Sequence, residues 1–323
     1  MDKALTVIIP AYNMSQYIDQ EMDSLLKETS ILPYLDIIIV NDGSKDDTLD
    51  KANRYAHKYP ESIRVIDKEN GGHGSGINVG IVEAKGKYLK VLDGDDWVDP
   101  EGLVELINYI MNETDSPDAI INPFEKVWEN GKREVISFEA IEPRKVVGFK
   151  EVVTNKYTLP LHTLTIKTQI YRDNKIPKID EKISYDDMEY ILYPVPYIKK
   201  IVFLEKVLYE YRLGLPGQSM NPEQMKKKLL MHTKVIESLA EYYRTKEKLF
   251  DNVQAEYYKQ EFVDTLGTNY EIQIKSGKQY RDIKRLIKQY SDFPLKQTKK
   301  KTFYLSNRIG MIGYCIACVK LRG

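Results

Sequence analysis

Four carboxylates crowd one short stretch of the sequence, KVLDGDDWVDP at residues 90–100. Asp93, Asp95, Asp96 and Asp99 fall within seven residues, directly after an apolar run. Clustered carboxylates repel one another unless a divalent cation neutralises them, and an oxygen-rich, histidine-poor set favours Mg²⁺ or Mn²⁺ over Zn²⁺. We therefore predict a metal site that uses Asp95, Asp93 and Asp96.

Asp99 has a simpler explanation. The triplet Asp99-Pro100-Glu101 is typical of a helix start, with proline at the first helical position. We expect Asp99 to cap that helix rather than bind metal. Capping does not account for Asp93 and Asp95.

Three other polar stretches also follow apolar runs. The apolar runs at 4–9, 35–40, 62–66 and 88–92 predict strands, and helical spacing occupies 46–59 and 76–84. Strands that alternate with helices indicate crossover connections and a parallel sheet. The polar stretches after the strands are, in order, Pro10-Ala11-Tyr12-Asn13, Asn41-Asp42-Gly43-Ser44, Asn70 to Gly76 and Asp93 to Asp96. Ligands bind at the carboxyl ends of such strands, so we expect all four stretches at one edge of the sheet.

Composition divides the chain into two regions. Apolar residues make up 42% and charged residues 30%, as in a soluble globular protein. Residues 1–215 carry 27 basic and 37 acidic side chains, whereas residues 216–323 carry 21 and 11. Helical periodicity dominates after Pro222, through 222–250, 253–275 and 278–290. We predict an α/β domain over 1–215 and a helical region over 216–323.

The motifs IIPAYN, IIIVNDGSKDDT, ENGG and GKYLKVLDGDDWVDP, in this order, closely resemble family 2 glycosyltransferases with the GT-A fold. The resemblance is strong over residues 4–110 and moderate over 160–220. It implies a Rossmann-like, mostly parallel sheet flanked by helices, followed by a C-terminal α-helical region. It also implies an inverting, metal-dependent transfer of one sugar from a UDP-sugar to a hydroxyl of a cell-surface polysaccharide, a lipid-linked glycan or a glycoprotein glycan. The Q-x-x-R-W segment of processive members is not found in the sequence.

The resemblance also assigns donor-binding roles. Tyr12 and Asp42 match the residues that hold the uridine base, and Asp93-Gly94-Asp95 matches the D-x-D motif that binds the ribose and the metal. Asp96 is a second candidate for the metal. The remaining predicted nucleotide-sugar contacts are Pro10, Asn70, Gly72, His73, Asn78, Trp97 and Arg212.

One position departs from the family pattern. Ile77 stands where many members carry arginine, so a positive contact to the donor is missing there. His73 and the backbone N–H groups of residues 71–74 could compensate; the alternative is that His73 is simply a solvated loop side chain.

An inverting transfer needs a general base that deprotonates the acceptor hydroxyl. The family's acidic pair matches Asp186 and Asp187, which makes Asp187 the predicted base and Asp186 its support. The alternative is structural, because Ser184-Tyr185-Asp186-Asp187 resembles a capping box with aspartate in place of glutamate.

Competing functions are less consistent with the motifs. A phosphatase would place its aspartate nucleophile after the first strand, and a nucleotidyltransferase would place a basic, glycine-rich loop there; Pro10-Ala11-Tyr12 supplies neither. The remaining alternative is a catalytically inactive nucleotide-sugar-binding or scaffold protein of the same fold. We expect a UDP-sugar and a glycan or lipid-linked saccharide as partners, with no nucleic acid, and we leave a homo-oligomer open.

The segment 296–323 could meet a membrane. It contains seven basic residues and no acidic one around the apolar run Ile309 to Val319. Eleven helical residues span about 16 Å, roughly half the hydrocarbon core, so this run is too short to cross. It could lie in the interface beside anionic head groups or pack on the protein as a final helix. The only two cysteines, Cys315 and Cys318, form no disulfide framework and are predicted to be packing residues. We therefore expect a cytoplasmic protein, with the inner face of the cell membrane as a second location.

Overall fold

A computed structural model describes residues 2–214 and 228–322 of the chain. The residues fall into two compact units, one within 1–215 and one within 216–323. Residues 215–227, where we predicted the boundary and the start of the first C-terminal helix, lie outside the described residues.

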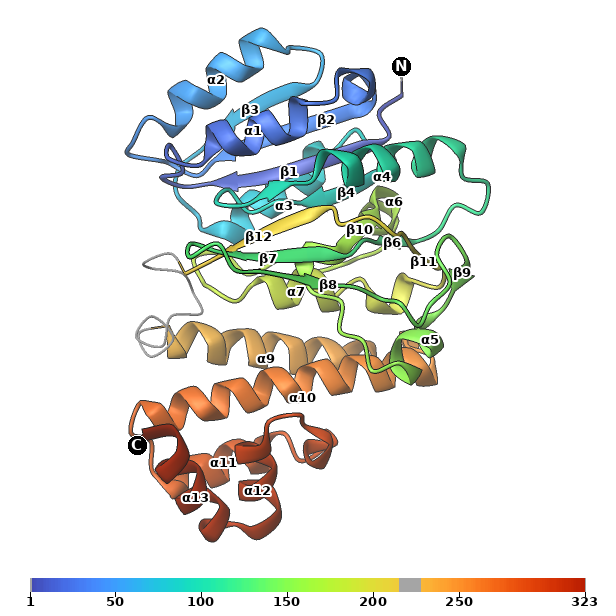
Figure 1. Ribbon diagram of the computed structural model, residues 1–323. Helices are drawn as coiled ribbons and strands as arrows, with labels where there is room; N and C mark the ends of the chain where they lie inside the picture. The colour runs from blue at the N-terminus through green and yellow to red at the C-terminus, as the bar shows by residue number, and fades with distance from the viewer. Residues whose placement is uncertain (1, 215–227, 323) are drawn as a thin grey trace. The chain divides into compact units, whose positions relative to one another are not determined.

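An eight-stranded sheet forms the centre of the first unit (Figure 1), in the order β3-β2-β1-β4-β10-β6-β11-β9. Its strands are β1 (Leu5–Ala11), β2 (Leu35–Asn41), β3 (Ile63–Asp67), β4 (Tyr88–Val91), β6 (Ala119–Ile121), β9 (Val146–Val147), β10 (Leu164–Lys167) and β11 (Ile201–Phe203). The first four strands pair in parallel, and β10 joins β4 in the antiparallel sense. The predicted strands and their parallel pairing are therefore confirmed.

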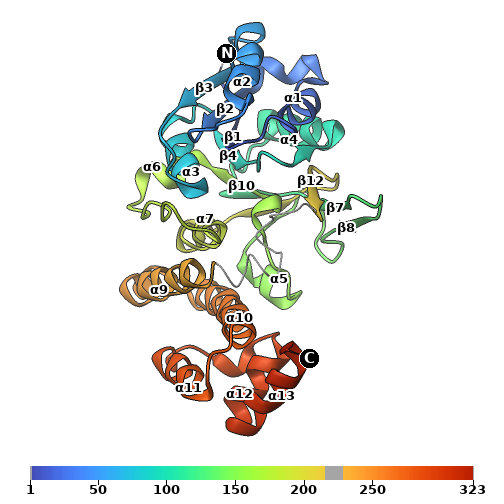
Figure 2. The same cartoon turned by 90° about the vertical axis from the view of Figure 1, so that its left-hand side faces the viewer.

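Helices cover both faces of this sheet. The helices of this unit are α1 (Ile18–Leu26), α2 (Thr48–Lys58), α3 (His73–Glu83), α4 (Pro100–Asn112), α5 (Phe149–Thr154), α6 (Thr168–Asp173) and α7 (Asp187–Leu192). Figures 1 and 2 show α1 and α4 on one face of the parallel strands and α3 on the other. All seven residues of β1 and of β2 are buried, which explains why these strands are continuous apolar runs rather than alternating ones.

The order of the parallel strands defines where a ligand would bind. The chain moves outward from β1 to β2 and β3, and then returns to place β4 on the other side of β1. The point at which the order reverses lies between β1 and β4, and this is where open α/β sheets bind ligands. The stretches after these two strands begin at Tyr12 and at Leu92, so the D-x-D motif lies at the switch point.

A second sheet adds side chains to that edge. Its order is β5-β12-β7-β8, with β5 (Trp97–Val98), β12 (Tyr209–Leu213), β7 (Phe124–Trp128) and β8 (Arg133–Ile136). Figure 2 shows β12, β7 and β8 beside the large sheet. Because β12 pairs with β5, with Glu210 opposite Trp97, the sheet brings residues near 210 to the acidic loop.

One local prediction in the first unit is also confirmed. Asp99 caps α4, since its carboxylate accepts hydrogen bonds from the backbone of Glu101 at 2.9 Å and of Gly102 at 3.1 Å.

The described part of the second unit is helical. Its helices are α9 (Leu229–Lys246), α10 (Asn252–Lys275), α11 (Tyr280–Gln289), α12 (Lys301–Ile309) and α13 (Met311–Arg322). Asp251 begins α10 with a capping box, and Tyr258 of α10 donates to the carbonyl of Leu239 in α9 at 2.8 Å. No helix among residues 2–214 and 228–322 is long and apolar enough to span a bilayer.

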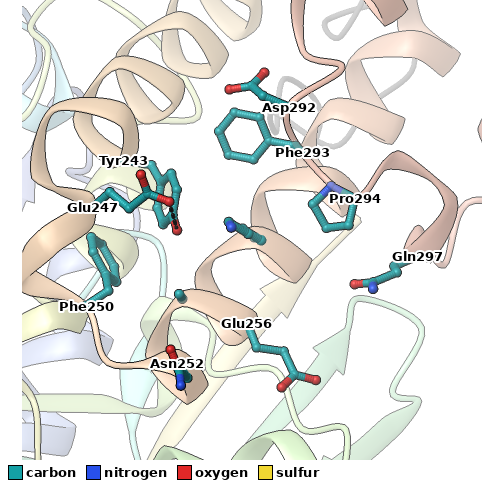
Figure 3. A pocket seen from close by; sticks show the side chains of 11 residues that line it. Tyr243, Glu247, Phe250, Asn252, Glu256, Asp292, Phe293, Pro294 and Gln297 are labelled. Atoms are coloured by element: carbon teal, nitrogen blue, oxygen red, sulfur yellow. Dashed lines mark hydrogen bonds between the residues drawn. The ribbon is translucent and has the colours of Figure 1, made fainter.

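A pocket lies within the described part of the second unit, with a cavity of about 590 Å³ (Figure 3). The rings of Tyr243, Phe250 and Phe293 line it together with acidic and amide side chains. None of the residues around it was predicted as a site residue.

The apolar end of the chain differs from its prediction in two respects. Cys315 is exposed on α13, so its assignment as a packing residue is wrong; Cys318 is half-buried. The run from 309 to 319 is also interrupted at Gly310, whose φ of 58° separates α12 from α13.

Candidate active site

The loops after β1 and β4 approach each other closely. A Cβ added at Gly94 would lie 2.9 Å from the Met14 side chain and 3.2 Å from the carbonyl oxygen of Pro10. The D-x-D motif can therefore reach the first loop only because its middle residue has no side chain. Tyr12, in that first loop, is 44% exposed, so its ring is available to a ligand.

Asp42 joins the second and third loops. Its buried carboxylate accepts hydrogen bonds from the backbone of Gly71 at 2.8 Å and of Gly72 at 2.7 Å, and it pairs with Lys68 at 2.7 Å. Asn70 donates in turn to the backbone carbonyl of Asp42 at 2.8 Å. These bonds fix the glycine-rich loop in front of α3.

The predicted role of Asn78 remains a prediction. In the structure its amide donates to the carbonyl of Ile179 at 2.8 Å and accepts from the backbone N–H of the same residue at 2.9 Å. Asn78 thereby ties α3 to the loop that precedes α7. Ile77 is fully buried, which explains how this position holds an apolar side chain.

Asp96 is held rigidly in the acidic loop. It is 1% exposed, and its two oxygens accept 2.7 Å hydrogen bonds from the Tyr209 hydroxyl and from the backbone N–H of Arg212. Burial, together with the neighbouring Asp95 and Asp93, raises the pKa of Asp96 well above its ordinary value.

His73 connects the D-x-D motif to the second acidic pair. Its Nε2 lies 2.9 Å from an oxygen of Asp93, and its Nδ1 lies 3.3 Å from both oxygens of Asp186. Burial opposes the charged ring, but the two carboxylates outweigh it and raise the pKa of His73 well above its ordinary value. The same contact holds the pKa of Asp93 below its ordinary value in spite of burial. The two carboxylates therefore favour the charged form of His73.

Close backbone approach makes this bridge possible. A Cβ at Gly74, one residue after His73, would lie 2.5 Å from the carbonyl oxygen of Asp180 and 2.7 Å from a carboxylate oxygen of Asp186. The third loop and the segment before α7 can meet only with glycine at this position.

The acidic pair does not form the capping box that was the structural alternative. Helix α7 begins at Asp187, and its cap residue Asp186 accepts no capping hydrogen bond. Tyr185 has a φ of 72°, which is uncommon for a residue with a side chain. Burial first, and then Asp186, raise the pKa of Asp187 to about 6.

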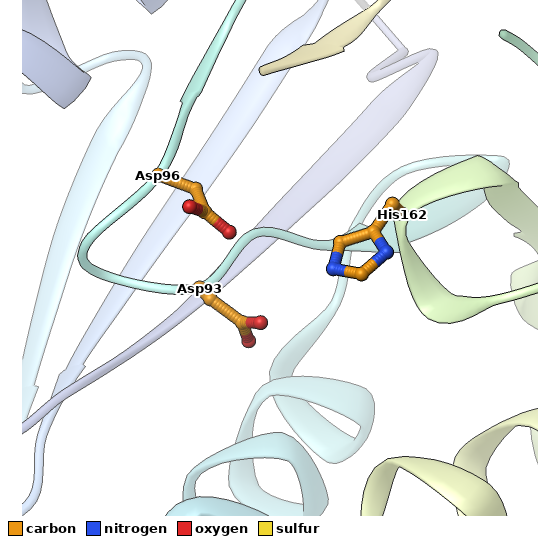
Figure 4. Close-up of side chains that lie close together, drawn as sticks. All are labelled: Asp93, Asp96 and His162. Atoms are coloured by element: carbon orange, nitrogen blue, oxygen red, sulfur yellow. The ribbon is translucent and has the colours of Figure 1, made fainter. Parts of the chain in front are cut away.

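A set of three potential metal ligands lies at this edge. One ligand atom from each of Asp93, Asp96 and His162 lies within 4.8 Å of the others, and Figure 4 shows both carboxylates on the loop after β4 and the imidazole on the neighbouring segment. Burial lowers the pKa of His162 to about 4, so the ring is neutral. In Figure 4 the nitrogen that faces the carboxylates is Nε2, whereas the buried Nδ1, which finds no hydrogen-bond partner within the described ranges, lies on the other side of the ring. A neutral imidazole that turns Nε2 toward two carboxylates fits a divalent cation. Asp95, the third predicted ligand, is not in this set.

Arg212 is packed between two rings. Its guanidinium carbon lies 4.6 Å from the ring centre of Trp97 and 5.0 Å from that of Tyr17. The side chain also donates to the carbonyl of Asp95 and to the Gln20 amide, both at 2.7 Å. Trp97 and Arg212, both predicted to contact the nucleotide sugar, therefore pack directly against each other.

Four residues of this region were missed by sequence reasoning: His162, Tyr209, Lys90 and Glu21. His162 and Tyr209 give no signal, because nothing in their neighbourhood indicates that they meet residues near 93. Lys90 does give a signal in the sequence, because a lysine within an apolar strand is unusual and suggests a specific role. It is 1% exposed and donates to the carbonyl of His162 at 2.7 Å, and burial lowers its pKa to about 7.

Glu21, on α1, is also buried at 1% exposure. Neither of its carboxylate oxygens has a hydrogen-bond partner among the residues described. Burial, and then Asp96, Asp95 and Asp93, raise the pKa of Glu21 well above its ordinary value.

Solved structures define the class of this fold. The chain superposes on Staphylococcus aureus TarS residues 1–349, solved in complex with UDP-GlcNAc, with a TM-score of 0.67 and 19% identity over 99% of this chain and 91% of that one. It also matches the mannosyltransferase PcManGT of Pyrobaculum calidifontis, in complex with GDP-Man and Mn²⁺, with a TM-score of 0.51 and 13% identity over 99% of this chain and 88% of that one. The parallel sheet with its acidic switch point is thus a GT-A fold.

The family follows from the sequence. The family model described as "Glycosyl transferase family 2" matches residues 6–180, which is more than half of the chain. The chain therefore belongs to glycosyl transferase family 2.

Curated relatives are longer than this chain. An uncharacterized glycosyltransferase of Rickettsia felis is 36% identical over 158 residues, which make up 49% of this chain and 24% of that protein. The poly(ribitol-phosphate) beta-glucosyltransferase of Bacillus spizizenii is 28% identical over 201 residues, or 56% of this chain and 31% of that protein. The matched part thus spans about a quarter to a third of these relatives.

Proposed function

We propose that this protein is an inverting, metal-dependent glycosyltransferase that moves one sugar from a UDP-sugar to an acceptor hydroxyl. The observation that carries the proposal is the His73 bridge. It joins Asp93 of the D-x-D motif to Asp186, next to Asp187, at the switch point of the sheet. A donor-binding carboxylate and a candidate base thereby meet at one edge.

The nucleobase is assigned to the first two loops. The exposed ring of Tyr12 can stack on a base, and an oxygen of Asp42 can accept the uracil N3–H beside its backbone bonds. Pro10, Asn70 and Gly72 shape the same edge, and Arg212 and Trp97 are assigned to the diphosphate and the sugar.

The metal is assigned to Asp93, Asp96 and His162, with Asp95 close by in the chain. This mixed set of oxygen and nitrogen donors is better suited to Mn²⁺ than to Mg²⁺, which prefers oxygen. A bound divalent cation would neutralise the diphosphate and stabilise its charge as it leaves.

Asp187 is assigned the role of general base. Its pKa of about 6 leaves it ionised at neutral pH, yet basic enough to take a proton from a hydroxyl. As the acceptor oxygen attacks the anomeric carbon, its proton passes to Asp187. The bond from that carbon to the phosphate oxygen breaks on the opposite face, UDP leaves, and the configuration inverts. Asp186 and His73 hold the segment before α7 in position.

The acceptor is assigned by class only. The Bacillus spizizenii relative is named for transfer to poly(ribitol phosphate), which supports a hydroxyl-rich polymer of the cell surface, whether polysaccharide or lipid-linked.

A panel of nucleotide sugars with Mn²⁺ tests the proposal. The expected result is release of UDP from at least one UDP-sugar, slowly to water alone and faster with acceptor, and loss of this release in EDTA. If UDP-sugars bind but no UDP is released under any of these conditions, the protein is the inactive nucleotide-sugar-binding protein that forms the alternative.

A further inference from the structure

Helix α13 has a buried side, which packs on the protein, and an exposed side that is also apolar. Gly313 and Ala317 are buried, and a Cβ at Gly313 would lie 2.3 Å from the backbone of Leu305 in α12. The opposite side carries exposed apolar residues, which we call the α13 apolar face: Met311 at 59% exposure, Ile312 at 67%, Ile316 at 36% and Val319 at 76%.

The spacing shows that this face is one continuous stripe. Ile312, Ile316 and Val319 follow each other at four and three residues, which places them on one side of a helix. Cys315 is exposed one turn after Met311. A contiguous stripe of exposed apolar side chains normally marks a surface that another surface covers, so the α13 apolar face is expected to have a partner.

The segment that carries this face is basic. Lys301, Arg308 and Lys320 are exposed, and Lys300 and Lys299, which also pairs with Asp264 at 3.8 Å, precede α12. No acidic residue occurs between 296 and 323. The partner must therefore combine an apolar surface with negative charge.

We propose that the α13 apolar face docks on the surface of a bilayer that contains anionic lipids. The apolar residues enter the boundary between head groups and acyl chains, and the basic residues meet the lipid phosphates. The helix lies in the plane of the membrane, because α13 has 12 residues and is far shorter than a spanning helix. This proposal does not depend on the transferase activity.

Charge distinguishes a bilayer from a second copy of the chain. Two copies that met through this face would bring two sets of basic residues together without an acidic residue of the segment to offset them. Like charges directly across an interface are unfavourable, whereas an anionic surface attracts each of them.

Flotation with vesicles tests the proposal with the full chain. Vesicles of phosphatidylcholine with phosphatidylglycerol should carry the protein upward at low salt, and vesicles of phosphatidylcholine alone should carry much less. Each basic side chain near the surface contributes about fivefold to partitioning, so Lys320→Glu should weaken binding by at least about fivefold. The pair Ile312→Ser with Ile316→Ser should weaken it by about tenfold or more, since two apolar anchors are lost.

Leu230→Ser is the matched control, because Leu230 is an apolar residue of the same unit at 83% exposure. It should leave partitioning unchanged, and circular dichroism should show that all variants fold. Absence of flotation at low salt, or equal flotation with uncharged vesicles, would overturn the proposal. A wild-type dimer in light scattering that the Ile312→Ser and Ile316→Ser pair converts to a monomer would instead identify a second copy as the occupant.

Discussion

At the residue scale, His73 is the side chain that links the D-x-D motif to the second acidic pair. It lies between Asp93 and Asp186, and its charged form provides a positive charge in a region otherwise dominated by carboxylates. The family's usual arginine is replaced by the buried Ile77, so His73 is the positive group nearest to that position along the chain. Its two carboxylate partners favour that charged form.

The pKa of Asp187 predicts how activity depends on pH. A general base works only when it is deprotonated, and the deprotonated fraction of a group with a pKa of about 6 increases as pH rises through 6. We expect kcat for UDP release to rise about tenfold per pH unit below 6 and to level off above 7. A profile that is flat between pH 5 and 8 would remove Asp187 from this role.

His162 should contribute to metal affinity. His162→Gln removes the neutral imidazole from the set with Asp93 and Asp96, and we expect Mn²⁺ to bind at least about tenfold more weakly in calorimetry. His232→Gln is a matched control, since His232 is another buried histidine with its pKa lowered to about 4. Equal Mn²⁺ affinity in the two variants would show that His162 is not a ligand.

Tyr12 and Asp42 should select the nucleobase. A carboxylate accepts the N3–H of uracil, and the same contact is open to thymine. Guanine also offers N–H donors, but its two-ring base places them differently relative to the ring of Tyr12. Calorimetry should show tighter binding of UDP than of GDP, by about tenfold, with dTDP close to UDP. Equal affinities for UDP and GDP would contradict this assignment.

Much of the candidate site could be predicted from the sequence, because many of its residues stand in recognisable short motifs. Asp42, Asp93 and Asp187 stand in motifs that follow strands or precede a helix, so their surroundings in the sequence reveal them. His162 has no such surroundings, because it reaches the acidic loop only through pairing of distant strands. Asp99 also shows that an acidic residue in the same stretch can have a purely structural role.

At the scale of elements, the packing of α3 on β1 decides the geometry of the third loop. Gly80 of α3 faces Ile8 of β1, and a Cβ there would lie 2.2 Å from the isoleucine side chain. Gly80→Ala should therefore push α3 away from the sheet and lower the free energy of unfolding by about 1–3 kcal/mol.

Urea denaturation measures this effect. Val82→Ala on the same helix is the control, because Val82 is 73% exposed and its truncation should change stability by no more than about 0.5 kcal/mol. If both variants unfold at the same urea concentration, the close contact between α3 and β1 is not important for stability.

The parallel strands could be predicted because helices cover both of their faces, which makes each a continuous apolar run. The second sheet could not be predicted in the same way. β12 pairs with β5 and β7, which lie about a hundred residues earlier in the chain, and the short strand β5 has no periodicity to reveal it. Through this pairing Tyr209 and Arg212 hold Asp96 by two hydrogen bonds, so the position of this carboxylate depends on contacts that a local sequence pattern cannot show.

At the scale of the whole molecule, charge differs between the two units. Residues 1–215 have a net charge of −10 and residues 216–323 a net charge of +10, so the overall balance of 48 basic and 48 acidic residues conceals two distinct surfaces. The acidic unit holds the candidate active site, where a cation would be needed before an anionic donor could bind. The basic unit carries the α13 apolar face, for which an anionic lipid surface is the proposed partner.

Turnover of Asp187→Asn tests the central claim most directly. This change removes the base but keeps the size of the side chain, and it leaves Asp93, Asp96 and His162 in place. At saturating donor with Mn²⁺ at pH 7.5, the account predicts that UDP release falls by at least about 10²-fold while the Kd for UDP stays within about twofold of wild type. Turnover near wild type in Asp187→Asn, or a larger loss in Asp186→Asn than in Asp187→Asn, would contradict the account.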